Sequence, residues 1–172
     1  MSAVEHLMTV SGPPFFAVSA EPKDVSNEAR GWQDSALVVR AIRGRKARTL
    51  EALFDEFAAA FQFPYYFGEN WAAFRDCITD LDWLPFRPGV VVVIYGAEQV
   101  LQDAHPAELG TLVTSLSSAA EEYGEAVADG EWWDRPPVPF HVVLQGATAD
   151  EFERWRAVGA EIAPLTIGGL GG

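Results

Sequence analysis

The sequence has one cysteine, Cys77, and three histidines among its 172 residues. A single cysteine excludes an intrachain disulfide and is typical of a protein from a reducing compartment. The histidines, His6, His105 and His141, are scattered along the chain, so cysteine and histidine together do not have the spacing of a zinc site. We therefore expect neither a metal nor another cofactor.

Glycine-rich phosphate loops and nucleophile motifs are also missing. The chain contains neither GxGxxG nor GxxxxGKS/T, and it has no GxSxG. A hydrolase that uses Cys77 with His141, or a carboxylate pair such as Asp80 and Asp82, is the enzymatic alternative. Both Cys77 and His141 lie in apolar stretches of predicted elements, which favours core packing. We predict no catalytic residues and no enzymatic activity.

Basic residues are scarce. The 12 Lys and Arg stand against 25 Asp and Glu, which gives a net charge of −13 and a pI of about 4.5. Residues 50–172 carry 5 basic and 20 acidic side chains, whereas five basic residues lie close together at Arg40, Arg43, Arg45, Lys46 and Arg48. Such a surface repels nucleic acid and anionic membranes and favours a basic protein partner, although solubility alone also explains many acidic surfaces.

Long hydrophobic runs are absent. No run approaches the roughly 20 residues of a membrane span. The N-terminal segment lacks the basic region and the long apolar core of a signal peptide. We expect a monomeric cytoplasmic protein that binds neither membranes nor nucleic acid.

Apolar runs and helical spacing predict alternating strands and helices. Strands are expected at 36–42, 89–95 and 140–144, and helices at about 50–62, 71–79, 106–123 and 149–158. Thr49 and Asn70 are suited to cap the first two helices. Strands separated by helices pair in parallel through right-handed crossovers. The prediction is an α/β fold with a three-stranded parallel sheet flanked by helices, which the terminal segments could extend.

The predicted domain organisation has three parts. Residues 1–33 are expected to form an N-terminal extension, in which Leu7, Phe15, Phe16 and Val18 could supply short strands at a sheet edge. Residues 34–146 form the main domain, and residues 147–172 form a C-terminal helix and tail packed on it. Within the main domain, the acidic segment 124–138 is long for a connection between a helix and a strand, which is typical of functional or mobile loops.

One stretch, residues 61–85, combines aromatic residues, a glycine turn and several carboxylates. Tyr65 and Tyr66 can present stiff, amphipathic contacts, and Gly68 supplies backbone freedom. The carboxylates, Asp76, Asp80 and Asp82, can accept forked hydrogen bonds from Arg or Lys. The residues alone are equally compatible with a binding surface and with core aromatics beside solvated carboxylates.

This stretch resembles the barstar family of ribonuclease inhibitors. The matching pattern is PYYFGENW at residues 64–71, followed by Phe74, Asp76, Cys77 and Thr79. The sequence LDWLP at residues 81–85 is similar to actinobacterial-type members, and the order of elements matches from about residue 35 to 145. The resemblance implies a three-stranded parallel sheet and the blockade of a ribonuclease active site by the loop and the short helix.

The resemblance also implies roles for individual residues. Asp76 would occupy the place of a substrate phosphate, Tyr66 matches the loop aromatic, Asn70 the helix cap and a contact, and Thr79 a further contact. Glu121 matches a glutamate on the next long helix. The predicted partner-binding residues are Tyr66, Gly68, Asn70, Arg75, Asp76, Thr79, Asp80 and Glu121.

Two positions depart from the family pattern. Ala72 stands where the prototype has a second contacting aspartate, and Arg75 stands where it has a tryptophan. Arg75 could pair with Asp76 in the free protein and compete with the cations of the enzyme. The partner is therefore expected to be a basic ribonuclease, with an immunity or interaction module for a different basic toxin or regulatory protein as the alternative.

Overall fold

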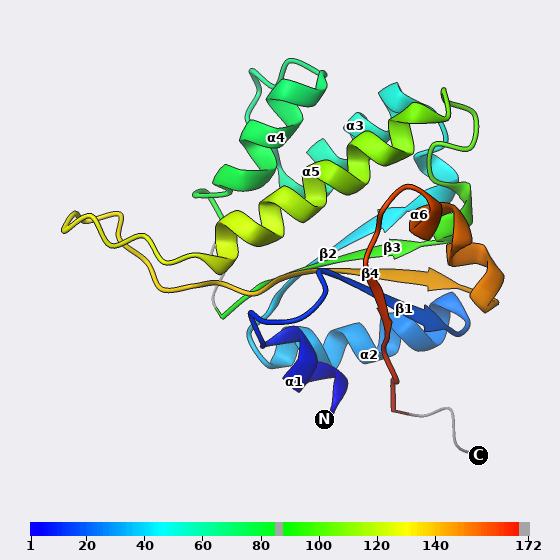
Figure 1. The fold of residues 1–172 in the computed structure, drawn as a ribbon, viewed down its shortest axis with the longest axis horizontal. Helices are drawn as coiled ribbons and strands as arrows, with labels where there is room; N and C mark the ends of the chain where they lie inside the picture. The colour runs from blue at the N-terminus through cyan, green and yellow to red at the C-terminus, as the bar shows by residue number, and fades with distance from the viewer. Residues whose placement is uncertain (85–87, 169–172) are drawn as a thin grey trace.

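The computed structural model describes residues 1–84 and 88–168, and a five-stranded parallel sheet lies at its centre (Figure 1). The strand order is β2-β3-β4-β1-β5, and every neighbouring pair is parallel. The strands are β1 Phe15–Ser19, β2 Val38–Arg43, β3 Val90–Tyr95, β4 Phe140–Gly146 and β5 Ile162–Pro164. In β3, Val90, Val92 and Ile94 face one side of the sheet, and Val91 and Val93 face the other. A continuous apolar run therefore marks a strand that is covered on both faces.

The predicted three-stranded sheet is wrong. The terminal segments, expected to be extensions, supply two further strands, β1 and β5. Strand β1 does not lie at an edge, because it pairs with β4 on one side and β5 on the other. Its short apolar run follows Pro13 and Pro14, and β5 has three residues and ends at Pro164, so neither segment has the long apolar run that indicates an inner strand.

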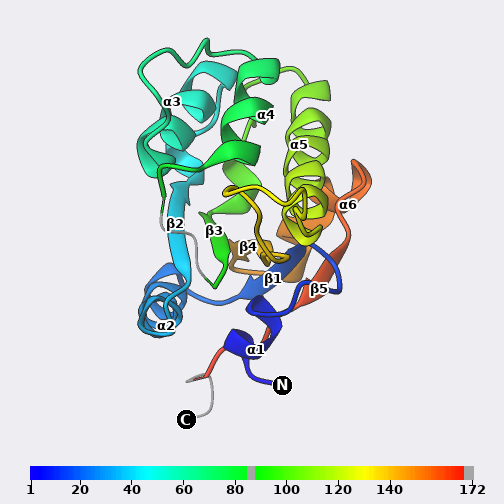
Figure 2. The same ribbon diagram turned by 90° about the vertical axis from the view of Figure 1, so that its left-hand side faces the viewer.

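Helices cover both faces of the sheet (Figure 2). On one face lie α1 Ala3–Leu7 and α2 Pro22–Asp34. The other face carries α3 Leu50–Phe61, α4 Trp71–Asp80, α5 Ala107–Gly124 and α6 Glu153–Ala157. Helices α3, α4 and α5 lie within a residue or two of their predicted bounds, whereas α2 was not predicted. Pro85, the last residue of the LDWLP match, and the end of the C-terminal tail lie outside the described residues.

Candidate functional site

The loop that joins α3 to α4 is a tight structure built from turns. Helix α3 ends at Phe61 and is followed by its C-cap Gln62, whose backbone is left-handed with a φ of 54°, and the Phe63 N–H still donates to Ala58 O. The Pro64 carbonyl then accepts a hydrogen bond from the Phe67 N–H at 2.9 Å. This turn leaves Tyr65 fully exposed and Tyr66 81% exposed. Two tyrosines therefore project from a loop whose backbone is held in place.

A cluster of aromatic rings lies beneath this loop. The Phe54 ring contacts the rings of Phe67, Trp71 and Phe74 at centroid distances of 5.8, 5.1 and 5.9 Å. Phe63 packs against Phe67 at 5.1 Å. The aromatic residues of the stretch thus divide by type: the phenylalanines anchor the loop to the core, and the tyrosines lie outside it.

Asn70 caps α4 with both polar atoms of its side chain. Its Oδ1 accepts from the Ala73 N–H at 2.9 Å, and its Nδ2 donates to Gly68 O at 3.1 Å. A Cβ at Gly68 would lie 3.1 Å from Asn70 Nδ2, so glycine leaves room for the cap. The left-handed backbone in this turn occurs at Glu69, with a φ of 48°.

The outer face of α4 carries most of the predicted contact residues. Arg75, Asp76 and Asp80 are exposed, and Ala72 lies on the same face. Thr79 is half-buried, and its hydroxyl donates to Arg75 O at 2.7 Å, so this donor is already used within the helix. Although Asp80 is exposed, desolvation by the neighbouring protein atoms, followed by the charge of nearby Asp82, raises its pKa. The face is thus a strip of carboxylates with one adjacent cation.

Helix α5 holds α4 at both ends. At the start of α4, the Trp71 indole Nε1 donates to Glu108 Oε2 at 2.7 Å. Near its end, the buried Tyr123 hydroxyl donates to Ile78 O at 3.0 Å. These two bonds fix the direction of the outer face of α4. The sequence did not predict these two bonds, because their partners are separated by 37 and 45 positions in the chain and only the fold brings them together.

Glu121 is not next to the other predicted contact residues. It lines a hollow of about 520 Å³ together with Val10, His141 and Glu161. Figure 2 shows α5 between α4 and the C-terminal part of the chain, which contributes to this hollow. The remaining seven predicted residues lie on the loop and on α4.

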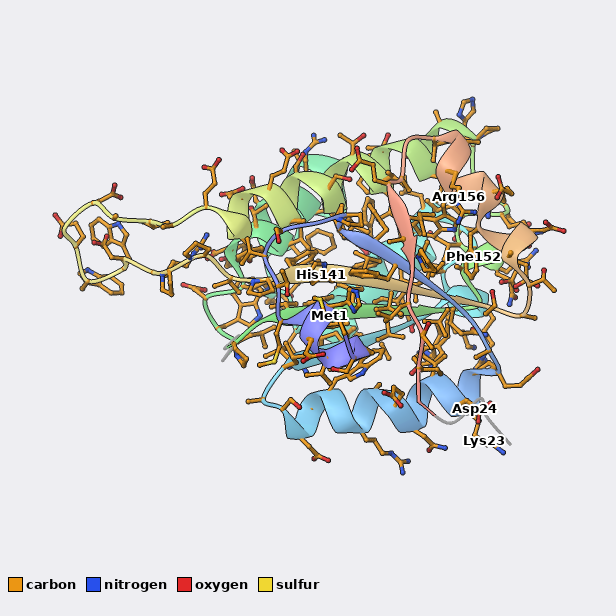
Figure 3. All side chains as sticks on the ribbon, turned by 60° about the horizontal axis from the view of Figure 1, so that its bottom comes forward. Met1, Lys23, Asp24, His141, Phe152 and Arg156 are labelled. Atoms are coloured by element: carbon orange, nitrogen blue, oxygen red, sulfur yellow. The ribbon has the colours of Figure 1, made fainter. Side chains whose placement is uncertain are left out.

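Cys77 and His141 are separated by the sheet. Cys77 points into the core from α4, and burial, then the charges of Asp76 and Asp80, raises the pKa of its thiol. His141 lies on β4 (Figure 3), packs against Phe16 on the opposite side of the sheet and donates from Nε2 to Thr9 O at 2.8 Å. Burial lowers the pKa of His141. The structure therefore does not form the nucleophile pair that the sequence left open.

Two further features of the described residues bear on the type of site. Within residues 1–84 and 88–168, no group of three or more His, Cys, Asp or Glu side chains is arranged to hold a metal ion. None of the helices in that part of the chain combines the length and apolar character needed to cross a bilayer.

Comparisons with known proteins give one family and a set of structural neighbours. The family model described as barstar (barnase inhibitor) matches residues 37–145, which is more than half of the chain and spans β2 to β4. A search of curated proteins gave no match.

Solved structures with a similar fold include Cdc6p from Pyrobaculum aerophilum, a Walker-type ATPase of Pyrococcus abyssi and the ORC2 protein of Aeropyrum pernix. Their TM-scores are 0.53, 0.54 and 0.56, with 14%, 11% and 11% sequence identity. They cover 89%, 95% and 96% of this chain, which spans only 39%, 50% and 44% of theirs. At such identities the likeness concerns the fold alone, and it agrees with a larger parallel sheet than the three strands predicted.

Proposed function

Because the chain belongs to the barstar family, we propose that it is a non-enzymatic inhibitor that covers the active site of a basic ribonuclease with residues 62–70 and the outer face of α4. One observation carries the proposal. Tyr66 on the loop and Asp76 on α4 are both exposed, while the elements that bear them are fastened to the core and to α5. A rigid surface of this kind binds with little loss of conformational entropy.

The charge of the surface supports a basic partner. Asp76 and Asp80 lie one turn apart on α4, in a chain with a net charge of −13. The excess negative charge steers a cationic enzyme toward the inhibitor, and Asp76 then docks against Arg or Lys where a phosphate of RNA would bind. No covalent step is needed, because occupation of the cleft excludes the substrate.

The structural neighbours include ATPases, but the connection between β1 and α2 in this chain lacks the features of a phosphate-binding loop, which supports a non-enzymatic role. Only Ala20 and Glu21 connect the two elements, and neither is a glycine. Phosphate loops cradle their ligand with the backbone N–H groups of a glycine-rich turn and a helix N-terminus. Here Pro22 removes one such N–H from the first turn of α2, and the Glu21 carboxylate repels phosphate.

The proposal is tested by titrating barnase, and each basic ribonuclease encoded in the same genome, with the full chain and measuring RNA cleavage. We expect stoichiometric inhibition of at least one enzyme. Asp76→Ala should weaken binding by about 2–5 kcal/mol, or about 30- to 5,000-fold, the range for truncating one partner of an interfacial charge pair, for which barstar is itself the standard example.

The matched control is Asp34→Ala. Asp34 is an exposed aspartate at the end of α2, on the opposite face of the sheet from α4. This variant should inhibit like the unmodified chain. Equal inhibition by Asp76→Ala and Asp34→Ala would show that α4 does not fill the cleft, and a failure to inhibit any ribonuclease would refute the proposed function.

Ala72 and Arg75 favour a second candidate partner, a basic toxin that is not a ribonuclease. Both residues are exposed on the face that carries Asp76, so an apolar residue and a cation stand where the resemblance places a carboxylate and an indole. The double variant Ala72→Asp, Arg75→Trp distinguishes the two. Stronger barnase inhibition by this variant, with weaker binding to the natural partner, would indicate a face specialised for another protein.

A further inference from the structure

Residues 125–137, which we call the arm, project from the body of the molecule beyond the end of α5 (Figure 1). Val127 and Arg135 exchange two backbone hydrogen bonds of 2.9 Å in an antiparallel bridge. Toward the tip, the Asp134 carboxylate accepts from the N–H groups of Asp129 and Gly130, both at 2.9 Å, and these bonds hold the pKa of Asp134 below its usual range. Hydrogen bonds within the arm therefore define its shape.

The base of the arm is fastened to the end of α5. The Arg135 guanidinium donates to the carbonyl groups of Glu122, Tyr123 and Glu125 at 3.1, 3.2 and 3.0 Å. It also lies over the Tyr123 ring, 5.3 Å from the centroid. The one basic side chain of the arm thus serves as its anchor and is not available to a partner in this arrangement.

Two tryptophans lie near the tip. Trp132 is 89% exposed and Trp133 is 50% exposed, and their rings meet edge to face at 5.5 Å. Trp32 and Trp155, by contrast, are fully buried. An exposed pair of indoles on a preformed hairpin is typical of the anchor residues of protein interfaces, because large rings remove much apolar surface from water while few rotamers have to be fixed.

We propose that the arm is a second contact surface for the basic protein that α4 binds, with the Trp132 and Trp133 indoles as its anchors. This inference rests on the proposed function. The two surfaces are linked through Tyr123: the Arg135 guanidinium lies over its ring, and its hydroxyl donates to Ile78 O near the end of α4, shortly before Asp80. Both α4 and the arm lie on the side of the molecule that faces the viewer in Figure 2.

The charge of the arm identifies the class of partner. Its acidic residues are all exposed, and they are Glu125, Asp129, Glu131 and Asp134. Acidic side chains around two indoles suit a surface on which Arg or Lys residues surround an apolar patch, because cations are attracted both to carboxylates and to the faces of aromatic rings. We expect this character at the rim of the cationic cleft of the proposed ribonuclease partner.

The inference is tested with the ribonuclease that the chain inhibits, chosen from barnase and the basic ribonucleases of the same genome. Association and dissociation rates are measured for the full chain, for Trp132→Ala with Trp133→Ala, and for Asp76→Ala. The Trp double variant should raise Kd about 10- to 100-fold, mainly through faster dissociation. Asp134→Ala keeps both indoles but loosens the tip, and should raise Kd less. Asp34→Ala, on α2 at the opposite face of the sheet from α4, is again the control and should bind normally.

Each outcome supports or overturns the inference. If Asp76→Ala weakens binding while the Trp double variant stays within twofold, the arm makes no contact and the proposed function stands. If no ribonuclease binds, the proposed function is refuted, and the inference about the arm is refuted with it. A further variant combines Asp76→Ala with both Trp substitutions. If its increase in Kd equals the product of the two separate increases, the arm and α4 contribute independently to binding. The unfolding temperature of each variant confirms that it is folded.

Discussion

Replacing Asn70 with alanine tests whether the cap of α4 organises both the helix and the binding loop. The variant loses an acceptor for the Ala73 N–H and a donor to Gly68 O. Loss of an N-cap costs about 1 kcal/mol, and an exposed amide hydrogen bond adds about 0.5 kcal/mol. We expect the free energy of unfolding to fall by about 1–2 kcal/mol, which lowers the Tm by roughly 3–6 °C in a chain of this length.

The control is Thr49→Ala, which removes the cap of α3. Thr49 Oγ1 accepts from the Ala52 N–H at 3.2 Å in the same geometry, but at the end of α3 that is far from the loop. Urea unfolding should show similar losses for the two variants, of about 1 kcal/mol or slightly more. Ribonuclease inhibition should weaken only for Asn70→Ala, by about tenfold, because only that change loosens the backbone between Tyr66 and α4. Equal inhibition by both variants would refute this reasoning.

Three further predictions concern buried groups. Hydrogen bonds from Arg43 hold the pKa of Glu56 below its usual range. Ionised Glu56 therefore stabilises the fold above about pH 4.3, and this contribution is lost as the pH falls through its folded pKa. Urea unfolding between pH 6 and 3 should show a steeper loss of unfolding free energy for the unmodified chain than for Glu56→Gln. The Cys77 thiol, buried and with a raised pKa, should react with a disulfide reagent at neutral pH only as fast as the protein opens, and fast labelling of the folded chain would contradict this. Tyr123→Phe should cost about 1–2 kcal/mol of unfolding free energy, because the buried Ile78 carbonyl loses its bond to the hydroxyl, and an unchanged urea midpoint would argue against that role.

Local signals predicted the elements that surround the candidate site. The apolar spacing of α3 and the cap residues Thr49 and Asn70 set the helix bounds to within a residue or two. Strand β3 was evident because a run of apolar residues is required where both faces of a strand are covered. These features depend on residues within one or two turns of each other, which a sequence records directly.

The sheet could not be completed from the sequence, because its missing strands have weak local signals. Strand β1 is short and follows two prolines, yet it is an inner strand because β4 pairs with it on one side and β5 on the other. The fold also decides which way a helical residue faces. Glu121 is only two residues from Tyr123, which contacts α4, but Glu121 itself lines the hollow with Val10 and Glu161.

The two terminal strands bear on the proposed binding surface although they lie outside the residues that the family model matches. Without β1, strand β4 would be an edge strand with unpaired backbone groups, whereas in this structure all seven of its residues are buried. Strand β4 begins at Phe140, three residues after the end of the arm, and Phe140 stacks on the Tyr123 ring at 5.4 Å. The Arg135 guanidinium of the arm lies over that ring, and the Tyr123 hydroxyl donates to Ile78 O near the end of α4. Strand β1 therefore supports the strand whose first residue packs against this junction, and we expect a change in β1 to reach the binding surface through β4 and Tyr123 rather than through direct contact with a partner.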